Sequence, residues 1–158
     1  MEHKVRIVSP DLIVEPLLGL LDETEAVPLV ISGGSMTPFL VHGRDTVYLS
    51  KASGPLKKGD MVLYLRDNGR YVLHRVLSAK DGLYTMIGDA QIYPEPGIRE
   101  DQIKAIVTAV RRKGRLLRKG SFWWTFFEKV WIRVIPIRPV VRDFYFFVKR
   151  LFYGKGDL

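Results

Sequence analysis

Six short β-like runs separated by turn signals constrain the fold of this chain more than any other feature. They cover residues 26–32, 45–51, 60–66, 70–79, 83–88 and 103–113, and they are rich in Val, Ile, Leu and Tyr. The sequences "HGRD", "GPLKKGD", "DNG", "KDG" and "PEPG" between them are typical of turns, and the "DNG" predicts a β-hairpin. The pattern predicts a mainly β fold, a compact antiparallel domain over roughly residues 24–113.

The segments on either side of these runs predict helices. Residues 10–22, "PDLIVEPLLGLLD", predict a short N-terminal helix with Ser9 as its N-cap, although Pro16 and Gly19 are unfavourable inside it. Residues 114–158 hold all three tryptophans and most of the phenylalanines. Their spacing predicts two amphipathic helices joined at the prolines of "PIRP". We therefore expect a β domain with its N-terminal helix over residues 1–113 and a basic aromatic helical tail over residues 114–158.

The positive charge of the chain is concentrated near its C-terminal end. Residues 111–158 hold 13 of the 25 Lys and Arg but only 3 of the 17 Asp and Glu, a net charge of +10. Three interpretations of the aromatic residues 121–152 stay open. They dock on the β domain, they lie in the interface of an anionic membrane, or they bind nucleic acid, which is the least favoured because no such motif is present.

Targeting signals bear on the compartment of the protein, whereas its cysteine content does not reveal it. The chain has no cysteine, which excludes disulfides and thiolate metal sites. The N-terminus lacks the order of a signal peptide, and the longest run without charge, residues 26–43, is interrupted by glycines and prolines. We expect a cytoplasmic protein, either free or peripheral at the inner face of the membrane.

Ser35 raises the question of chemistry, because "SGGSMTPFL" places it where glycines let the chain bend. An ordinary turn has the same composition. A serine nucleophile needs a base, and His3, His42 and His74 are the only histidines. His3 lies near the terminus, His42 lies in a turn, and His74 alternates with valines on the inward face of its strand, while Arg75 faces the other way. A core histidine bonded to a backbone carbonyl is the alternative for His74.

The motifs occur in an order that resembles a known superfamily. They are Ser35-Met36-Thr37-Pro38, Gly59-Asp60, His74-Arg75 and Gly88-Asp89, each at a strand edge. As a set they resemble the serine peptidase superfamily of signal peptidases and LexA-type self-cleaving repressors, over roughly residues 27–110. Histidine before the arginine, in place of lysine, resembles the branch that includes the endoplasmic-reticulum and archaeal signal peptidases.

The resemblance implies a role for each of these residues. Ser35 would be the nucleophile, His74 the general base and Asp89 the acid that holds the imidazole, with Arg75 structural. The backbone N–H of Ser35 would donate to the oxyanion. Many members carry a second donor serine at the position of Gly33, so Ser32, one residue earlier, is the candidate second donor. The second acid of the histidine branch has its nearest candidate in Glu95.

The resemblance predicts a serine endopeptidase that cleaves an extended peptide, leader-like or signal-like, through an acyl-enzyme and without a metal or cofactor. Two alternatives stay open. One is a binding module of the same fold with an impaired site, which holds a peptide or partner. The other is a self-cleaving regulator, which is disfavoured because only 34 residues precede Ser35.

Overall fold

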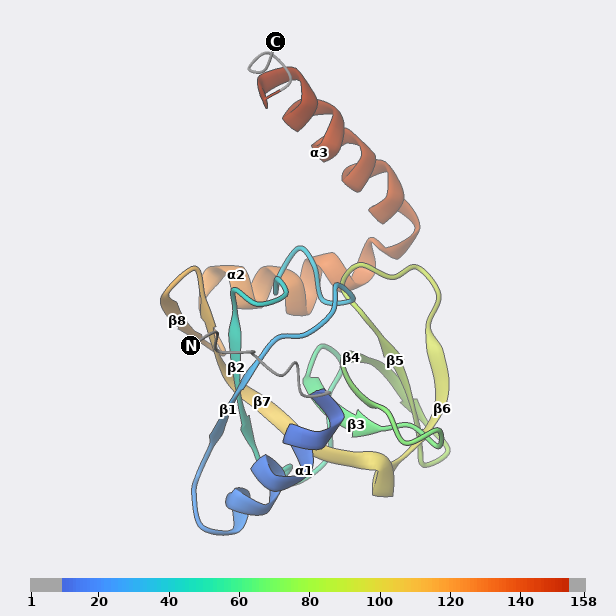
Figure 1. The fold of residues 1–158 in the computed structure, drawn as a ribbon. Helices are drawn as coiled ribbons and strands as arrows, with labels where there is room; N and C mark the ends of the chain where they lie inside the picture. Colours follow the sequence, from blue (N-terminus) through green and yellow to red (C-terminus); the bar gives the residue numbers. More distant parts are fainter. Residues whose placement is uncertain (1–9, 154–158) are drawn as a thin grey trace, which may run out of the picture.

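The computed structural model describes residues 10–153, in which the dominant feature is one antiparallel sheet. The strand order is β1-β2-β7-β3-β4-β5-β6, and β8 pairs with β7. The strands are β1 (Val27–Val30), β2 (Thr46–Ser50), β3 (Met61–Leu65), β4 (Tyr71–Lys80), β5 (Leu83–Ile87), β6 (Glu95–Arg99), β7 (Ile103–Arg112) and β8 (Arg115–Arg118). Figure 1 shows the strands gathered in one body, with helices at both ends of the chain.

The mainly β, antiparallel fold predicted from the sequence is confirmed, and each of the six predicted runs forms a strand. The "DNG" turn connects β3 and β4 as an antiparallel hairpin. Two strands were not predicted. β6, "EPGIR", contains Pro96 and Gly97, and β8, "RLLR", spans only four residues, so neither carries a clear alternating pattern.

The predicted N-terminal helix is also present. It consists of α1 (Pro10–Gly19), with Pro16 inside it, and a 3₁₀ turn, η1 (Leu20–Asp22). Val14 and Leu21 are buried in the main hydrophobic cluster, which explains why the helix forms despite its proline. The proposed N-cap, Ser9, lies outside the described residues.

The two faces of the sheet contribute to two hydrophobic clusters. The larger one joins β1, β2, β3 and β7 to α1 and to the helical segment after β8, with Phe39 and Leu40 fully buried. The smaller one contains Val62, Tyr64, Val76, Met86 and Ile98. The register of the hairpin decides which side chains of β4 face each cluster: His74 lies opposite Val62 on β3, and Val72 lies opposite Tyr64. His74 and Tyr64 therefore share one face, and Arg75 lies on the other.

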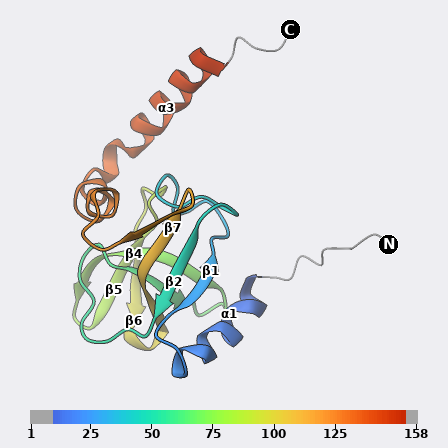
Figure 2. The same cartoon turned by 90° about the vertical axis from the view of Figure 1, so that its left-hand side faces the viewer.

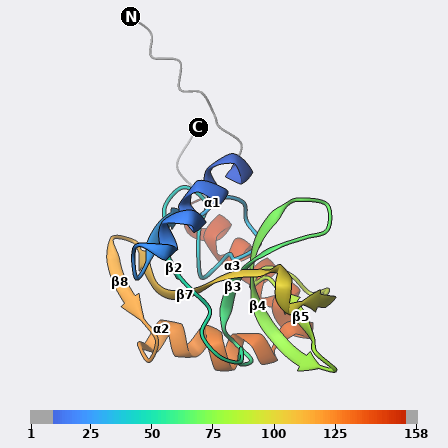
Figure 3. The ribbon, with the colours of Figure 1, turned by 90° about the horizontal axis from the view of Figure 1, so that it is seen from below.

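The first half of the basic aromatic segment belongs to the β domain. It forms α2 (Phe122–Thr125), a π-helical turn η3 (Phe126–Val130) and 3₁₀ turns η4 (Trp131–Arg133) and η5 (Ile135–Ile137). Trp124, Phe127 and Trp131 are buried in the larger cluster. Figure 3 shows this segment crossing one side of the domain, beginning next to β8. With β8 paired to β7, the structure extends the domain beyond the boundary predicted at residue 113.

The second half of the segment behaves differently. Helix α3 (Arg138–Tyr153) follows the turn that contains Pro136 and projects away from the sheet (Figures 1 and 2). Phe144, Phe147 and Leu151 are exposed along it. Within residues 10–153, no helix has the length and apolar character needed to cross a membrane.

The contrast between the two halves predicts that a Phe→Ala substitution is costly in the first half and nearly neutral in the second. Phe127→Ala should lower the free energy of unfolding by about 3–5 kcal/mol, because it opens a cavity in the larger cluster. Phe144→Ala should change it by less than about 0.5 kcal/mol, because Phe144 is exposed on α3. Urea unfolding followed by circular dichroism measures both values. Similar losses in the two variants would contradict the division of the segment at η5.

Candidate active site

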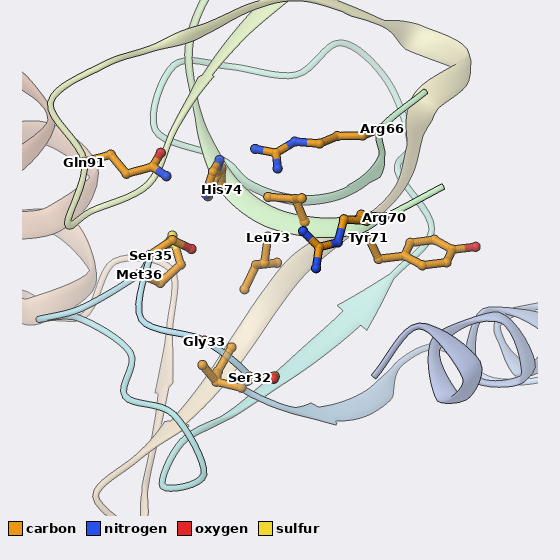
Figure 4. Close-up of a pocket in the computed structure, with 12 residues that line it drawn as sticks. Ser32, Gly33, Ser35, Met36, Arg66, Arg70, Tyr71, Leu73, His74 and Gln91 are labelled. Carbon is orange, nitrogen blue, oxygen red and sulfur yellow. The ribbon is translucent and has the colours of Figure 1, made fainter. Parts of the chain in front are cut away.

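A pocket of about 390 Å³ brings the two principal candidate residues together. Ser35 enters it from the segment after β1, and His74 enters it from the middle of β4 (Figure 4). Gln91, from the loop after β5, lines the same pocket. The sequence prediction that Ser35 and His74 share a site is therefore consistent with their positions.

The Ser35 turn is built as its glycines suggest. Gly33 has a positive φ of 82°, a conformation that favours glycine, and its N–H donates to Nδ1 of His42 at 3.1 Å. Met36 is buried beneath the turn in the larger cluster, and Ser35 itself is half-buried. Among the described residues, none accepts a hydrogen bond from the N–H of Ser35. This N–H is therefore available to a substrate oxygen.

Gly88 lies where the Ser35 turn approaches the imidazole. A Cβ atom at Gly88 would lie 2.5 Å from the carbonyl oxygen of Ser35 and 3.1 Å from Nε2 of His74. Both atoms therefore lie close to the same position beside Gly88, and Nε2 is the ring nitrogen on the side of the serine. The N–H of Ala90 donates to the same Ser35 oxygen at 2.8 Å, which ties the two loops together. Within residues 10–153, the Ser35 hydroxyl and His74 are not hydrogen-bonded to each other.

The other ring nitrogen of His74 faces a tyrosine. Nδ1 lies 3.1 Å from the hydroxyl of Tyr64, and that hydroxyl donates to Oε2 of Glu95 at 2.6 Å. Arg66 donates to both oxygens of Glu95, at 2.8 Å and 2.6 Å. The alternative in which a backbone carbonyl holds His74 is not what the structure shows, because a side chain occupies Nδ1.

Burial sets the protonation states of these groups. Burial lowers the pKa of His74 to about 4, against the opposing effect of the Glu95 charge, so the imidazole is neutral at pH 7. Burial likewise raises the pKa of Tyr64, which keeps its proton. Burial acts to raise the pKa of Glu95, but hydrogen bonds from Arg66 and Tyr64 outweigh it and hold that pKa below its usual value.

Asp89 is not brought to His74. Both of its carboxylate oxygens accept hydrogen bonds from Nε of Arg75, at 2.9 Å and 3.2 Å, and both side chains are completely buried. The expectation that Asp89 holds the imidazole is therefore corrected. The reason is the alternation of β4, which directs Arg75 and His74 to opposite faces, and Asp89 lies on the arginine's side. Burial raises the pKa of Asp89, and the charges of Arg75 and Arg138 oppose this.

Asp60 has a structural position. Its carboxylate accepts hydrogen bonds from the backbone N–H of Lys57 at 2.7 Å and from Nζ of Lys119 at 2.9 Å. The carbonyl of the preceding Gly59 accepts a hydrogen bond from Nη1 of Arg75 at 3.0 Å. The Gly59-Asp60 motif thus closes a turn and supports the buried arginine.

Gln91 is better placed than Ser32, the candidate from the sequence, to be a second hydrogen-bond donor beside the N–H of Ser35. Ser32 is exposed and lies with Gly33 away from His74, whereas Gln91 lies beside His74 (Figure 4). Oε1 of Gln91 accepts a hydrogen bond from the N–H of Gly88 at 3.1 Å, so the amide nitrogen is directed to the opposite side. Figure 4 shows that nitrogen on the side of Ser35 and His74. No sequence pattern marked this glutamine.

The helical segment supports the loop that follows β5. Nε1 of Trp131 donates to the carbonyl of Asp89 at 2.8 Å. Arg138, the first residue of α3, donates to the carbonyls of Gly88 and Gln91 at 2.8 Å and 2.7 Å. The amino-acid pattern did not predict this contact between the basic segment and the site.

Comparisons with models of known protein families, with curated proteins and with solved structures found no match.

The burial of Arg75 with Asp89 predicts a large and pH-dependent loss of stability in Arg75→Met. At neutral pH this variant leaves a buried carboxylate without its partner, which should cost about 3–5 kcal/mol. Burial already raises the pKa of Asp89 in the wild-type protein, and loss of the opposing Arg75 charge should raise it further above the unfolded value. Protonation at acidic pH therefore favours the folded state, and the loss should shrink as the pH falls. Urea unfolding at several pH values measures it.

Arg99→Met is the matched control, because Arg99 forms exposed ion pairs with Asp67 and Asp101. It should cost less than about 1 kcal/mol. Equal losses in the two variants at neutral pH would contradict a structural role specific to the buried pair.

Proposed function

We propose that this protein is a serine endopeptidase in which Ser35 is the nucleophile and His74 the general base. The observation that carries the proposal is that the Ser35 carbonyl and Nε2 of His74 both lie next to Gly88, and that Ser35 and His74 line one pocket. The burial of His74 supports it, because a low pKa keeps the imidazole neutral and able to accept a proton at pH 7. The order of the four motifs adds the resemblance to signal peptidases.

The chemistry follows from these positions. Nε2 of His74 accepts the proton of the Ser35 hydroxyl as Oγ attacks the scissile carbonyl carbon. The N–H of Ser35 and the amide of Gln91 donate to the oxyanion of the tetrahedral intermediate. The imidazolium then gives its proton to the leaving amine, and an acyl-enzyme remains on Ser35. His74 then takes a proton from water as the water oxygen attacks the ester carbonyl carbon. The ester bond breaks, the imidazolium returns its proton to Oγ of Ser35, and the acid is released.

An extended peptide is the substrate class that fits the walls of the pocket. Val72 and Leu73 of β4 line it, and β5 pairs with β4 only from Arg75 onward. Residues 71–74 of β4, which precede this pairing, border the pocket along the edge that β5 would otherwise continue. The residues after β1 line the opposite wall. A peptide in β conformation placed between these walls would form backbone hydrogen bonds with its scissile bond near Ser35.

A binding module with an impaired site is the second candidate. Gly33 stands where many members of the superfamily that the motifs resemble carry a donor serine. The Ser35 hydroxyl is not hydrogen-bonded to His74 within the described part of the chain. The two candidates differ in turnover, because a binding module holds the peptide without breaking it.

Single substitutions at the nucleophile and the base test the proposal. Ser35→Ala and His74→Ala should each lower kcat/KM by at least about 10³-fold, and the double variant should be no worse, because the two groups act as one unit. Mass spectrometry of a mixed peptide library measures cleavage whatever the sequence preference of the enzyme. Ser50→Ala is the control, since Ser50 lies on β2, outside the pocket.

Two results would contradict the endopeptidase proposal. One is full activity in Ser35→Ala. The other is a wild-type protein that binds peptides of the library, retains them intact and loses nothing on substitution of Ser35, which would favour the binding module.

We also propose that the enzyme works at an anionic membrane surface through α3. Val140, Phe144, Phe147 and Leu151 form an exposed apolar stripe at helical spacing. Arg150 is exposed beside the stripe, and Arg142, which forms an ion pair with Asp143, is exposed on the opposite side of the helix. An apolar stripe on a helix that also carries exposed cations fits acyl chains and anionic headgroups together. Arg138 connects this helix to the loop of the site, so a docked α3 would hold the pocket near the surface.

Vesicle sedimentation tests this location. The purified protein should bind vesicles that contain anionic lipid, and higher salt should weaken the binding. Phe144→Ser combined with Phe147→Ser should reduce the bound fraction by about tenfold or more, since it removes two large rings from the stripe. Tyr93→Ser, at an exposed aromatic residue in the loop between β5 and β6, should have no effect. Absence of binding by the wild-type protein at low salt would overturn the membrane proposal.

A further inference from the structure

We infer that Tyr64 and Glu95, rather than Asp89, position the imidazole of His74 and select its tautomer. The inference rests on the proposed function. The motif resemblance gives Tyr64 no role and makes Glu95 only the nearest candidate for a second acid. The chain of contacts runs from Nδ1 of His74 to the Tyr64 hydroxyl, from there to Oε2 of Glu95, and ends at Arg66.

A count of protons assigns the direction of each hydrogen bond. The Tyr64 hydroxyl has one proton and two neighbours, Nδ1 at 3.1 Å and the carboxylate oxygen at 2.6 Å. An ionised carboxylate only accepts hydrogen bonds, so the proton of the tyrosine lies toward Glu95. The contact between Nδ1 and the tyrosine oxygen then needs a proton on Nδ1. Neutral His74 therefore carries its proton on Nδ1, and Nε2 has the free electron pair that a general base needs.

Arg66 is the reason that this direction is the favoured one. If Glu95 were protonated, it would donate to the tyrosine oxygen, and the tyrosine would donate to Nδ1. The proton of the imidazole would then be on Nε2, which faces Ser35 and could no longer accept the serine proton. Two hydrogen bonds from Arg66, at 2.8 Å and 2.6 Å, favour the ionised carboxylate and therefore the productive tautomer.

The fold holds the two inner residues of this chain of bonds in the interior. Tyr64 and His74 are diagonal neighbours on one face of the β3–β4 hairpin, and both are almost completely buried. Glu95 is the first residue of β6, and Arg66 directly follows β3. When Nε2 accepts the serine proton, the new positive charge on the ring is stabilised by the tyrosine oxygen, whose dipole is oriented by Glu95. Tyr64 and Glu95 act through His74 and are positioning residues.

Tyr64→Phe tests the inference, because it removes only the hydroxyl. Long-range ¹⁵N–¹H correlation spectra of the imidazoles report which nitrogen of His74 carries the proton, without any substrate. The wild-type protein should show the proton on Nδ1, and Tyr64→Phe should show a mixture of tautomers. Tyr84→Phe is the matched control, since Tyr84 packs against the same hydrophobic cluster outside this chain of bonds. It should keep the wild-type spectrum.

Activity provides the second measurement. Tyr64→Phe should lower kcat by about 100-fold with little change in KM, because misorientation removes part of the general-base contribution. Glu95→Gln should lower kcat in the same way and gives a second route if Tyr64→Phe does not fold. Asp89→Asn, if folded, should leave the tautomer of His74 unchanged.

The two kinds of measurement separate the inference from the proposed function. A wild-type imidazole with its proton on Nε2, or a spectrum unchanged in Tyr64→Phe, would overturn the inference even in an active enzyme. An inactive wild-type protein whose His74 nonetheless shows the predicted tautomer would overturn the proposed function and leave the positioning by Tyr64 in place.

Discussion

A guanidinium group buried in the protein interior organises the rest of this structure. Arg75 has no exposed side-chain surface, and it contacts the carboxylate of Asp89, the carbonyl of Gly59 and the ring of Phe39, whose centroid lies 5.0 Å away. A charge in such a place is tolerated only with a charged partner and hydrogen bonds. Meeting that demand fixes the turn before β3 and the loop after β5 against β4. The last three of the four motifs therefore meet at one side chain.

The loop that follows β5 transmits this constraint to the site. Arg75 holds it through Asp89, while Trp131 and Arg138 bind its backbone carbonyls from the helical segment. Its Ala90 N–H in turn holds the carbonyl of Ser35. The serine is thus positioned through backbone contacts that extend to the interior. Such support would suit the proposed reaction, because catalysis is sensitive to displacements of about 1 Å. The aromatic segment, distinct in composition, is part of the support of the site.

Much of this arrangement was predictable from local patterns, and the remainder depends on tertiary contacts. Alternation along β4 correctly placed His74 and Arg75 on opposite faces, because the period of a strand is fixed by its backbone. The same pattern gives no information on which face an acid after the next strand will serve, and the assignment of Asp89 to the histidine comes from the family resemblance alone. The positions of Tyr64 and Glu95 near His74 depend on the register of the hairpin and on β6. The proline and glycine of β6 are atypical of a strand, so the sequence did not predict it.

The aromatic residues show the same limit. Trp124 and Phe127 follow a helical spacing similar to that of Phe144 and Phe147, yet the first pair is buried and the second pair is exposed. Periodicity indicates that a helix has an apolar side. It contains no information on whether the domain covers that side, because this depends on where the chain leaves the sheet.

The separation of two acids on the two faces of β4 also explains how the imidazole of a buried histidine can remain neutral. A carboxylate in direct contact with an imidazole favours the charged ring and raises its pKa. Here Asp89 is neutralised by Arg75 on the other face, and Glu95 reaches His74 only through the hydroxyl of Tyr64. The charge of Glu95 is thereby kept at a distance and is partly balanced by Arg66, so the effect of burial prevails and the pKa of His74 is about 4. In the proposed mechanism a neutral hydroxyl group orients the base, and the carboxylate that orients this hydroxyl does not favour the protonated form of the imidazole.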